Sequence, residues 1–241
     1  MTVLERVGYY DRDTALTGWL ARPQGAARAA VLVWPTIANV TPAIERRAQM
    51  LADRGFLALI GDYYGEPVRD FDHARELAGV LRADTDNYRA RLAAGLVALR
   101  ALPGAGGLPE AVIGYCMGGQ AALEVARTGA DVRAVVSFHG VLDTGRRAEP
   151  DAVKARILIC HGDADPLAPR DHVLSLWDEL NTARAQWHFH SYSGVRHGFT
   201  DPGSDARGIP AIGYDASADR QSWAAMMSLF DEVFSKNRNW P

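Results

Sequence analysis

The sequence predicts an α/β protein built on a mostly parallel sheet with helices on both faces. Short, continuous apolar runs alternate with segments of helical periodicity along most of the chain. The chain has 241 residues, 48% of them hydrophobic and 23% charged, which is enough to bury a substantial core. We therefore expect a single α/β domain spanning residues 1–241, with an antiparallel hairpin at its N-terminus.

The elements follow in order. Alternating apolar residues at 3–10 and 16–21, joined through Asp11-Arg12-Asp13, predict the hairpin. Apolar runs then predict buried strands at residues 29–34, 57–60, 111–115, 134–138, 157–160 and 186–192. Helical spacing predicts helices at residues 43–54, 72–81, 88–102, 119–128, 171–181 and 218–236, with breakers such as Leu102-Pro103-Gly104 between elements.

Charge and composition exclude several classes of partner. The net charge is −3, and the basic residues occur only as short pairs such as Arg46-Arg47, so we expect no nucleic-acid partner. The N-terminus lacks a signal-peptide pattern and no window approaches the ~18 apolar residues of a membrane span, which predicts a cytoplasmic protein with no membrane partner. We expect Cys116 and Cys160 to be free thiols and the chain to be a monomer or weak homodimer.

The segment around Cys116 has the pattern of a nucleophile elbow. An apolar run at 111–113 leads into Gly114-Tyr115-Cys116-Met117-Gly118-Gly119, after which a helical pattern begins. A strand that reverses into a helix within about one residue needs small neighbours and projects its central side chain. The helix N-terminus would lower the pKa of a thiol placed there. A buried cysteine in an ordinary glycine-rich turn is the alternative.

Two later loops supply an acid and a base in the matching order. The apolar run at residues 157–160 is followed by the loop His161-Gly162-Asp163-Ala164-Asp165-Pro166. A later loop contains Val195-Arg196-His197-Gly198-Phe199. The order nucleophile, acid, base is that of hydrolases with a Ser…Asp/Glu…His triad, here with Cys in place of Ser. We expect Cys116 to attack, His197 to move the proton and Asp165 to orient the imidazole, with Asp163 the alternative acid.

The other histidines have simpler interpretations. His161, at a strand end, is expected to pack, and His73 and His172, on helical patterns, to face solvent. His188 and His190 share a strand face, but no third ligand is recognisable, so we expect no metal and no cofactor. Cys160 is expected in the core.

These motifs together resemble the dienelactone hydrolase family, cysteine-nucleophile members of the α/β-hydrolase fold. The similarity lies in the cysteine elbow at 114–119, in Gly61-Asp62-Tyr63-Tyr64-Gly65, in Ser137-Phe138-His139-Gly140, and in residues 161–166 and 192–199. It implies hydrolysis of a small ester or lactone through a thioester-linked acyl-enzyme. Likeness to the fold also implies an oxyanion hole formed by the backbone N–H groups of Ile37 and Met117.

The chain departs from this family at positions that bear on the substrate. Family members carry a Glu near the nucleophile where this chain has Thr36, and an arginine beyond the catalytic His where it has Asp201, which would repel an anionic substrate. Another family arginine corresponds to Arg75. The expected pocket residues are Thr36, Tyr64, Arg75, His139 and Phe199, with Phe71 farther from the site.

The sequence therefore predicts a cofactor-independent hydrolase acting on a small-molecule ester or lactone. A thioesterase or acyltransferase with the same triad is the alternative enzyme, because a thiol-bound acyl group can pass to water or to another acceptor. From another class, Cys116 could serve a ligand-binding or redox-sensing protein.

Overall fold

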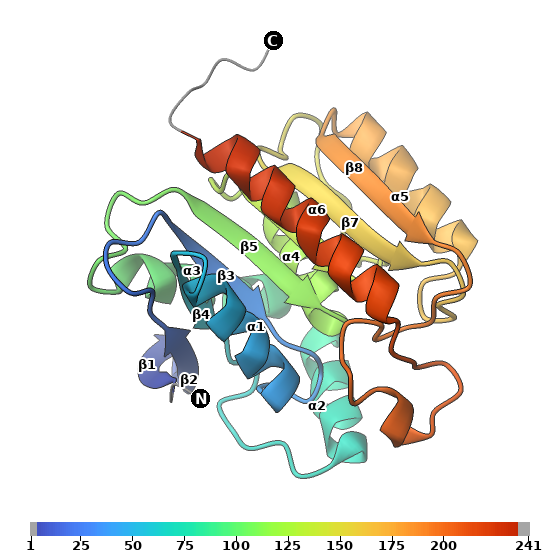
Figure 1. Cartoon of the computed structure of the whole chain (residues 1–241), viewed down its shortest axis with the longest axis horizontal. Coiled ribbons are helices and arrows are strands. Elements are labelled where there is room, and N and C mark those ends of the chain that lie inside the picture. The colour runs from blue at the N-terminus through green and yellow to red at the C-terminus, as the bar shows by residue number, and fades with distance from the viewer. Residues whose placement is uncertain (1–3, 236–241) are drawn as a thin grey trace.

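The computed structural model describes residues 4–235, which contain one eight-stranded sheet (Figure 1). The strands lie in the order β1-β2-β4-β3-β5-β6-β7-β8. The pairs β1–β2 and β2–β4 are antiparallel, and all other neighbours are parallel. The bounds are β1 Glu5–Asp11, β2 Thr14–Ala21, β3 Ala29–Trp34, β4 Phe56–Ile60, β5 Glu110–Tyr115, β6 Ala134–Phe138, β7 Arg156–Gly162 and β8 Gln186–Tyr192.

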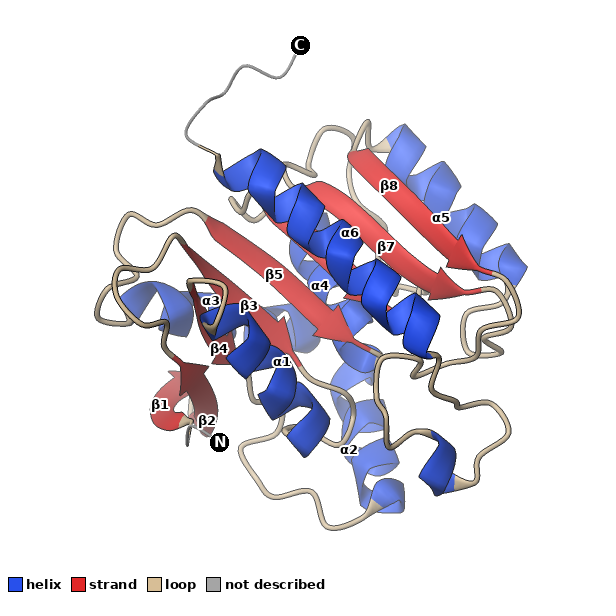
Figure 2. Cartoon of the chain, in the orientation of Figure 1, coloured by secondary structure: helices blue, strands red, loops and turns tan. Residues whose placement is uncertain are grey.

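Helices cover both faces of this sheet (Figure 2). On one face, α1 and α6 pack over β3 to β7, while α3, α4 and α5 lie on the other (Figure 1). The bounds are α1 Pro42–Ala52, α2 Phe71–Ala83, α3 Thr85–Ala101, α4 Met117–Arg127, α5 Arg170–Thr182 and α6 Ala216–Phe234. The carboxyl ends of the parallel strands therefore open toward one edge, where ligands collect in such sheets.

The predicted fold is confirmed, and the expected elements are all found in the described part of the chain. The helices begin one to three residues earlier than the apolar periodicity indicates, and in α1, α2, α3 and α6 a polar N-cap side chain accounts for the earlier start. Asp70 accepts the N–H of His73, and Asp84 accepts the N–H groups of Asp86 and Asn87. Val3, in the expected first strand, and Lys236, in the expected last helix, lie outside the described residues.

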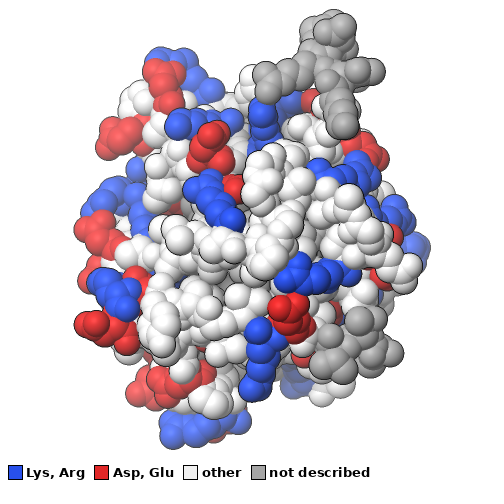
Figure 3. Space-filling view, turned by 90° about the vertical axis from the view of Figure 1, so that its left-hand side faces the viewer, with Lys and Arg blue, Asp and Glu red and all other residues white. Residues whose placement is uncertain are grey.

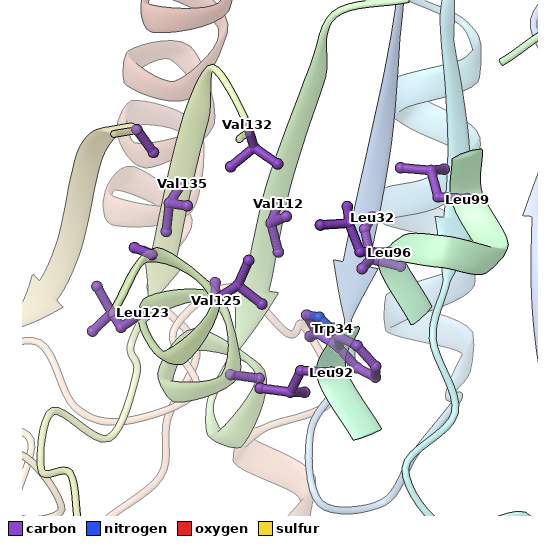
Figure 4. Packing of buried hydrophobic residues seen from close by; sticks show 14 of the residues in the cluster. Leu32, Trp34, Leu92, Leu96, Leu99, Val112, Leu123, Val125, Val132 and Val135 are labelled. Carbon is purple, nitrogen blue, oxygen red and sulfur yellow. The ribbon is translucent and has the colours of Figure 1, made fainter. Parts of the chain in front are cut away.

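Two apolar clusters sandwich the sheet. Figure 4 shows Leu32 and Trp34 of β3 with Val112 of β5, facing leucines of α3 and Val125 of α4. The opposite cluster joins Val33 and Ile113 to α1 and α6. Burying each such side chain contributes about 1.5–3 kcal/mol relative to exposure. The continuous apolar runs thus behave as expected of strands covered on both sides.

A buried network of charges anchors the back of α4. Arg127 donates to Glu124 at 2.9 Å and to Glu179 of α5 at 2.8 Å, and Arg89 of α3 also donates to Glu124 at 2.8 Å. Buried charges are tolerated when they are paired in this way, and removal of one partner is strongly destabilising. The network fixes α4, whose N-terminus carries Cys116, against two neighbouring helices.

The outer surface carries mixed charge. On the face in Figure 3, Lys and Arg side chains are interspersed with Asp and Glu, without a patch of one sign. Among residues 4–235, no helix has the length and apolarity needed to cross a membrane.

The elbow depends on glycine for close backbone contact. A Cβ on Gly114 would lie 1.8 Å from the carbonyl oxygen of Gly118, and a Cβ on Gly118 would lie 2.0 Å from the carbonyl oxygen of Trp34. Backbone atoms cannot move aside as a flexible side chain can. The first turn of α4 therefore packs directly on the ends of β3 and β5.

We predict that Gly114→Ala lowers the free energy of unfolding by about 3 kcal/mol or prevents folding, because the added methyl overpacks the elbow. The control is Gly79→Ala in α2, where a Cβ meets no heavy atom within 4 Å. That change should stabilise the protein by up to about 1 kcal/mol through helix propensity. Urea unfolding measures both, and equal stability of the two variants would contradict the packing argument.

Candidate active site

Cys116 stands at the junction of β5 and α4 in a strained backbone conformation. Its φ is 59° and its ψ −119°, the left-handed side of the map that residues with a Cβ rarely occupy. The side chain is partly exposed, whereas Cys160 is fully buried in the core as predicted. The elbow thus presents the Cys116 thiol at the carboxyl edge of the sheet.

The structure brings Asp165 and His197 together at the same edge. Asp165 lies in the turn after β7, and its Oδ2 is 2.7 Å from Nδ1 of His197. Its other oxygen accepts the N–H of Leu167 at 2.8 Å, and both side chains are buried. Asp163, the alternative acid, instead pairs with Arg170 at 3.1 Å near the surface. The geometry favours Asp165 as the partner of the imidazole.

The electrostatics favour a thiolate beside an imidazolium. Burial opposes the thiolate, but the positive charge of His197 outweighs it and lowers the pKa of Cys116, helped by the backbone N–H of Met117. Burial likewise opposes the imidazolium, but the Cys116 charge and the bond to Asp165 raise the pKa of His197 to about 10. Because Nδ1 of His197 is bonded to Asp165, and Nε2 has no hydrogen-bond partner within the described residues, Nε2 is the nitrogen available to exchange a proton with the Cys116 thiol.

Hydrogen bonds from two tyrosine side chains fix the loop between β3 and α1. Tyr64 donates its hydroxyl to the carbonyl oxygen of Ile37 at 3.1 Å, and Tyr63 donates to that of Pro35 at 3.0 Å. Asp62 accepts from Asn39 at 2.7 Å. These bonds fix the peptide planes of the loop that carries Ile37, the expected oxyanion donor, and leave its front facing the cavity.

A cavity of about 640 Å³ opens above Cys116. Thr36, Ile37 and His139 line it, as the sequence predicts, together with His197. The rest of the wall is largely apolar and includes Ile44, Val68, Phe71, Leu167, Ile209 and Ile212. Such a pocket suits a ligand with a substantial apolar part.

Three expected pocket residues do not line this cavity. Tyr64 is turned behind the β3–α1 loop by its bond to Ile37. Phe199 is fully buried, packed edge-on against the rings of His139 and Tyr192. Arg75 lies exposed on α2, away from the cavity, because its helical position faces solvent.

Other expectations also need correction. Phe71, expected to be farther away, lines the cavity at the start of α2. His73, expected to face solvent, is buried and its Nδ1 accepts the N–H of Arg69 at 3.3 Å. Asp201 does line the cavity, but it pairs with Arg207, so its charge is compensated.

Arg47 is a wall residue that the sequence did not single out. It is buried, donates to the carbonyl oxygen of Thr200 at 2.8 Å and pairs with Asp219 of α6. Its guanidinium also lies over the rings of Tyr115 and Trp223. Arg47 lies on the buried face of α1, whereas the neighbouring Arg46 is more exposed. That position in the helix is the only local signal that could have indicated this role.

No group of three metal-ligating side chains is found among residues 4–235. His188 and His190 are exposed on one face of the edge strand β8, as expected.

Comparison with known proteins identifies the family of the chain. The family model of the dienelactone hydrolase family matches residues 16–234. The chain belongs to this family. An uncharacterised protein of Caenorhabditis elegans is 33% identical over 147 residues, covering 60% of this chain and 93% of that protein.

Two further relatives carry functional names. A Bradyrhizobium protein named "Probable 2-oxo-3-(5-oxofuran-2-ylidene)propanoate lactonase" is 29% identical over 202 residues, covering 78% of this chain and 80% of its own. Among solved structures, the dienelactone hydrolase-like promiscuous phosphotriesterase P91, from metagenomic libraries, is 34% identical with a TM-score of 0.92. That match covers 97% of this chain and all of P91.

We predict that, near neutral pH, iodoacetamide labels Cys116 but not Cys160 in the folded protein. Cys116 is partly exposed with a lowered pKa, whereas burial raises the pKa of Cys160 to about 12. Mass spectrometry of tryptic peptides measures the labelling of each thiol, with urea-unfolded protein as the control in which both react. Equal native labelling would contradict the assignment of a reactive thiol.

Proposed function

We propose that this protein hydrolyses small carboxylic esters or lactones through a thioester acyl-enzyme on Cys116. The observation that carries the proposal is the 2.7 Å bond from Asp165 to His197, on the loop beside a strained elbow cysteine. Orienter, base and nucleophile in this arrangement are the elements of nucleophilic acyl transfer.

In the acylation step, the Cys116 thiolate attacks the ester carbonyl carbon and forms a tetrahedral oxyanion. The backbone N–H groups of Met117 and Ile37 are the proposed donors to that oxygen. The intermediate then expels the alkoxide, which takes the Nε2 proton of His197 and leaves as an alcohol. For a lactone, the alcohol remains attached to the acyl group. Asp165 stabilises the imidazolium until the proton moves.

Deacylation reverses the roles of the same groups. Neutral His197 takes a proton from water, and the resulting hydroxide attacks the thioester carbon. Collapse of the second tetrahedral intermediate breaks the C–S bond, releasing the carboxylic acid and restoring the thiolate–imidazolium pair. If an alcohol or amine replaced water at this step, the protein would act as an acyltransferase, and a thioester substrate would make it a thioesterase.

The cavity supports an apolar substrate. Phe71 and Leu167 are about half exposed and both line the cavity, so they offer apolar surface at its entrance. Arg47 and Asp201 are each neutralised by an ion pair, and the exposed Arg69 and Asp70, which also line the cavity, carry opposite charges. An uncharged ester with an aromatic or branched group therefore fits the lining better than a dianionic one.

The likeness to P91 favours a second candidate activity, hydrolysis of neutral phosphotriesters. Attack of the thiolate at phosphorus would follow the same sequence, with loss of an alcohol or phenol and hydrolysis of the S–P bond. Turnover of p-nitrophenyl carboxylates, lactones, thioesters and a diethyl p-nitrophenyl phosphate on one enzyme sample would rank these substrate classes.

We predict that Cys116→Ala is folded but inactive, and that Asp165→Asn lowers kcat by about 10⁴, as loss of the orienting acid does in triads. Asp163→Asn is the matched control, because Asp163 pairs with Arg170 and should leave kcat near the wild-type value. Ester hydrolysis with circular dichroism measures rate and folding. An inactive Asp163 variant beside an active Asp165 variant would transfer the acid role.

We also predict that Thr36→Glu raises the pKa of the Cys116 thiol and leaves hydrolysis level or lower. Thr36 lines the cavity with Cys116, and a carboxylate there would add negative charge near a thiolate that Asp165 already opposes. Thr36→Gln is the neutral control of similar size. The rate of iodoacetamide labelling as a function of pH measures the effect. Faster labelling with higher esterase activity in the Glu variant would show that this chain lacks an activating base.

A further inference from the structure

His139 bridges the nucleophile and the loop that follows the general base. Its Nδ1 is 3.1 Å from the backbone nitrogen of Cys116, and its Nε2 is 2.9 Å from Oγ1 of Thr200. The ring is almost completely buried. Because both ring nitrogens are engaged by protein groups, neither is free to hydrogen-bond a substrate, although the ring lines the cavity.

These bonds determine which ring nitrogen carries the proton. The Cys116 N–H is a donor, so Nδ1 of His139 must accept with its lone pair. The proton then belongs on Nε2, which donates to the Thr200 hydroxyl. Burial first, and then the charge of His197 with those of Arg47 and Arg207, holds the pKa of His139 well below its usual value. The ring is therefore neutral and in one tautomer.

The contact joins two strained residues. Cys116 has φ 59° and His139 has φ 38°, both left-handed. Such conformations cost about 1–3 kcal/mol each and persist only where the surroundings enforce them. The Cys116 N–H is shared between Nδ1 of His139 and the carbonyl oxygen of Phe138, 3.1 Å away, while the His139 N–H donates to the carbonyl oxygen of Cys160 at 2.8 Å. These bonds enforce both conformations.

The ring also limits the position of the general base. The centroids of His139 and His197 are 5.1 Å apart at an interplanar angle of 71°, an edge-to-face contact. Thr200, which accepts from His139, lies three residues after His197 and is held from the other side by Arg47. A shift of His139 would move the thiol and the imidazole relative to each other.

We propose that His139 is a positioning residue, whose neutral imidazole, protonated on Nε2, holds the Cys116 backbone and the Thr200 loop so that thiol and His197 align. This inference rests on the proposed Cys116–Asp165–His197 triad. His139 takes no proton from substrate, and its effect reaches the reaction only through the placement of those groups.

Three substitutions at His139 test separately the acceptor at Nδ1, the backbone strain at positive φ and the contact of Nε2 with Thr200. His139→Asn places Oδ1 as many bonds from the backbone as Nδ1, and Asn tolerates positive φ. His139→Gly relieves the strain but has no acceptor. His139→Gln reaches toward Thr200 but places no acceptor at the Nδ1 position. The proposal therefore predicts the highest activity for the wild type, lower activity for His139→Asn, and the lowest for His139→Gly and His139→Gln.

We expect kcat for an activated ester to fall by about 10²-fold in the Gly and Gln variants, since a small misplacement of reacting groups has that effect. KM should change little, and Asn should restore kcat to within about tenfold of wild type. Thiolate absorbance near 240 nm, followed against pH, should show a raised Cys116 pKa in Gly and Gln but not in Asn. Cys116→Ala supplies the baseline for this titration.

Two results would overturn the proposal. One is equal kcat and equal thiolate titration in the Asn, Gly and Gln variants. The other is a wild-type ¹H–¹⁵N spectrum that places the His139 proton on Nδ1, a measurement that needs no variant to fold. If the wild type hydrolysed no ester, the proposed function would fail, whereas the titration and the tautomer would still test His139.

Discussion

The packing of the elbow glycines against neighbouring backbone is the constraint on which the site depends. Gly114, Gly118 and Gly119 leave no space for a Cβ, because backbone atoms of β3, α4 and the β6 end already occupy it. Together with the hydrogen bonds of its N–H group, this packing holds Cys116 at positive φ at the N-cap of α4. The thiol consequently gains exposure, the Met117 N–H and proximity to His197, and each of these follows from the same close contact.

The N-terminal hairpin is part of the active-site framework, although it lies at the far edge of the sheet. Asp62, after β4, accepts the N–H of Thr17 in β2 at 2.9 Å and the side chain of Asn39 in the β3–α1 loop. Tyr9 of β1 donates to the carbonyl oxygen of Asp62 and accepts its N–H. The buried carboxylate thus links the hairpin to the loop that carries Ile37. Preorganised donors are effective because they need no rearrangement when negative charge develops.

The sequence was sufficient for elements whose signal is local. The apolar runs placed the strands, and the glycines around Cys116 identified the turn, since both reflect contacts within a few residues. Tyr64 and Phe199 were placed incorrectly because a side chain's direction depends on partners distant in sequence, Ile37 in one case and His139 in the other. Arg47 was overlooked for a similar reason. Its role requires Asp219 and Thr200, more than 150 positions away, which no local pattern indicates.

The buried charges near the cavity serve the framework rather than ligand binding. Arg47 binds Asp219 and the Thr200 carbonyl oxygen, and it would have to break both contacts to reach an anionic substrate. Leaving Asp219 unpaired in a buried position would be strongly destabilising, so that movement is unfavourable. The cationic group is therefore committed to holding the loop of His197 in place. What remains for recognition is the apolar wall, the exposed Arg69 of the lining and the two proposed backbone donors. The backbone donors respond to a developing oxyanion more than to a charge already present on the substrate.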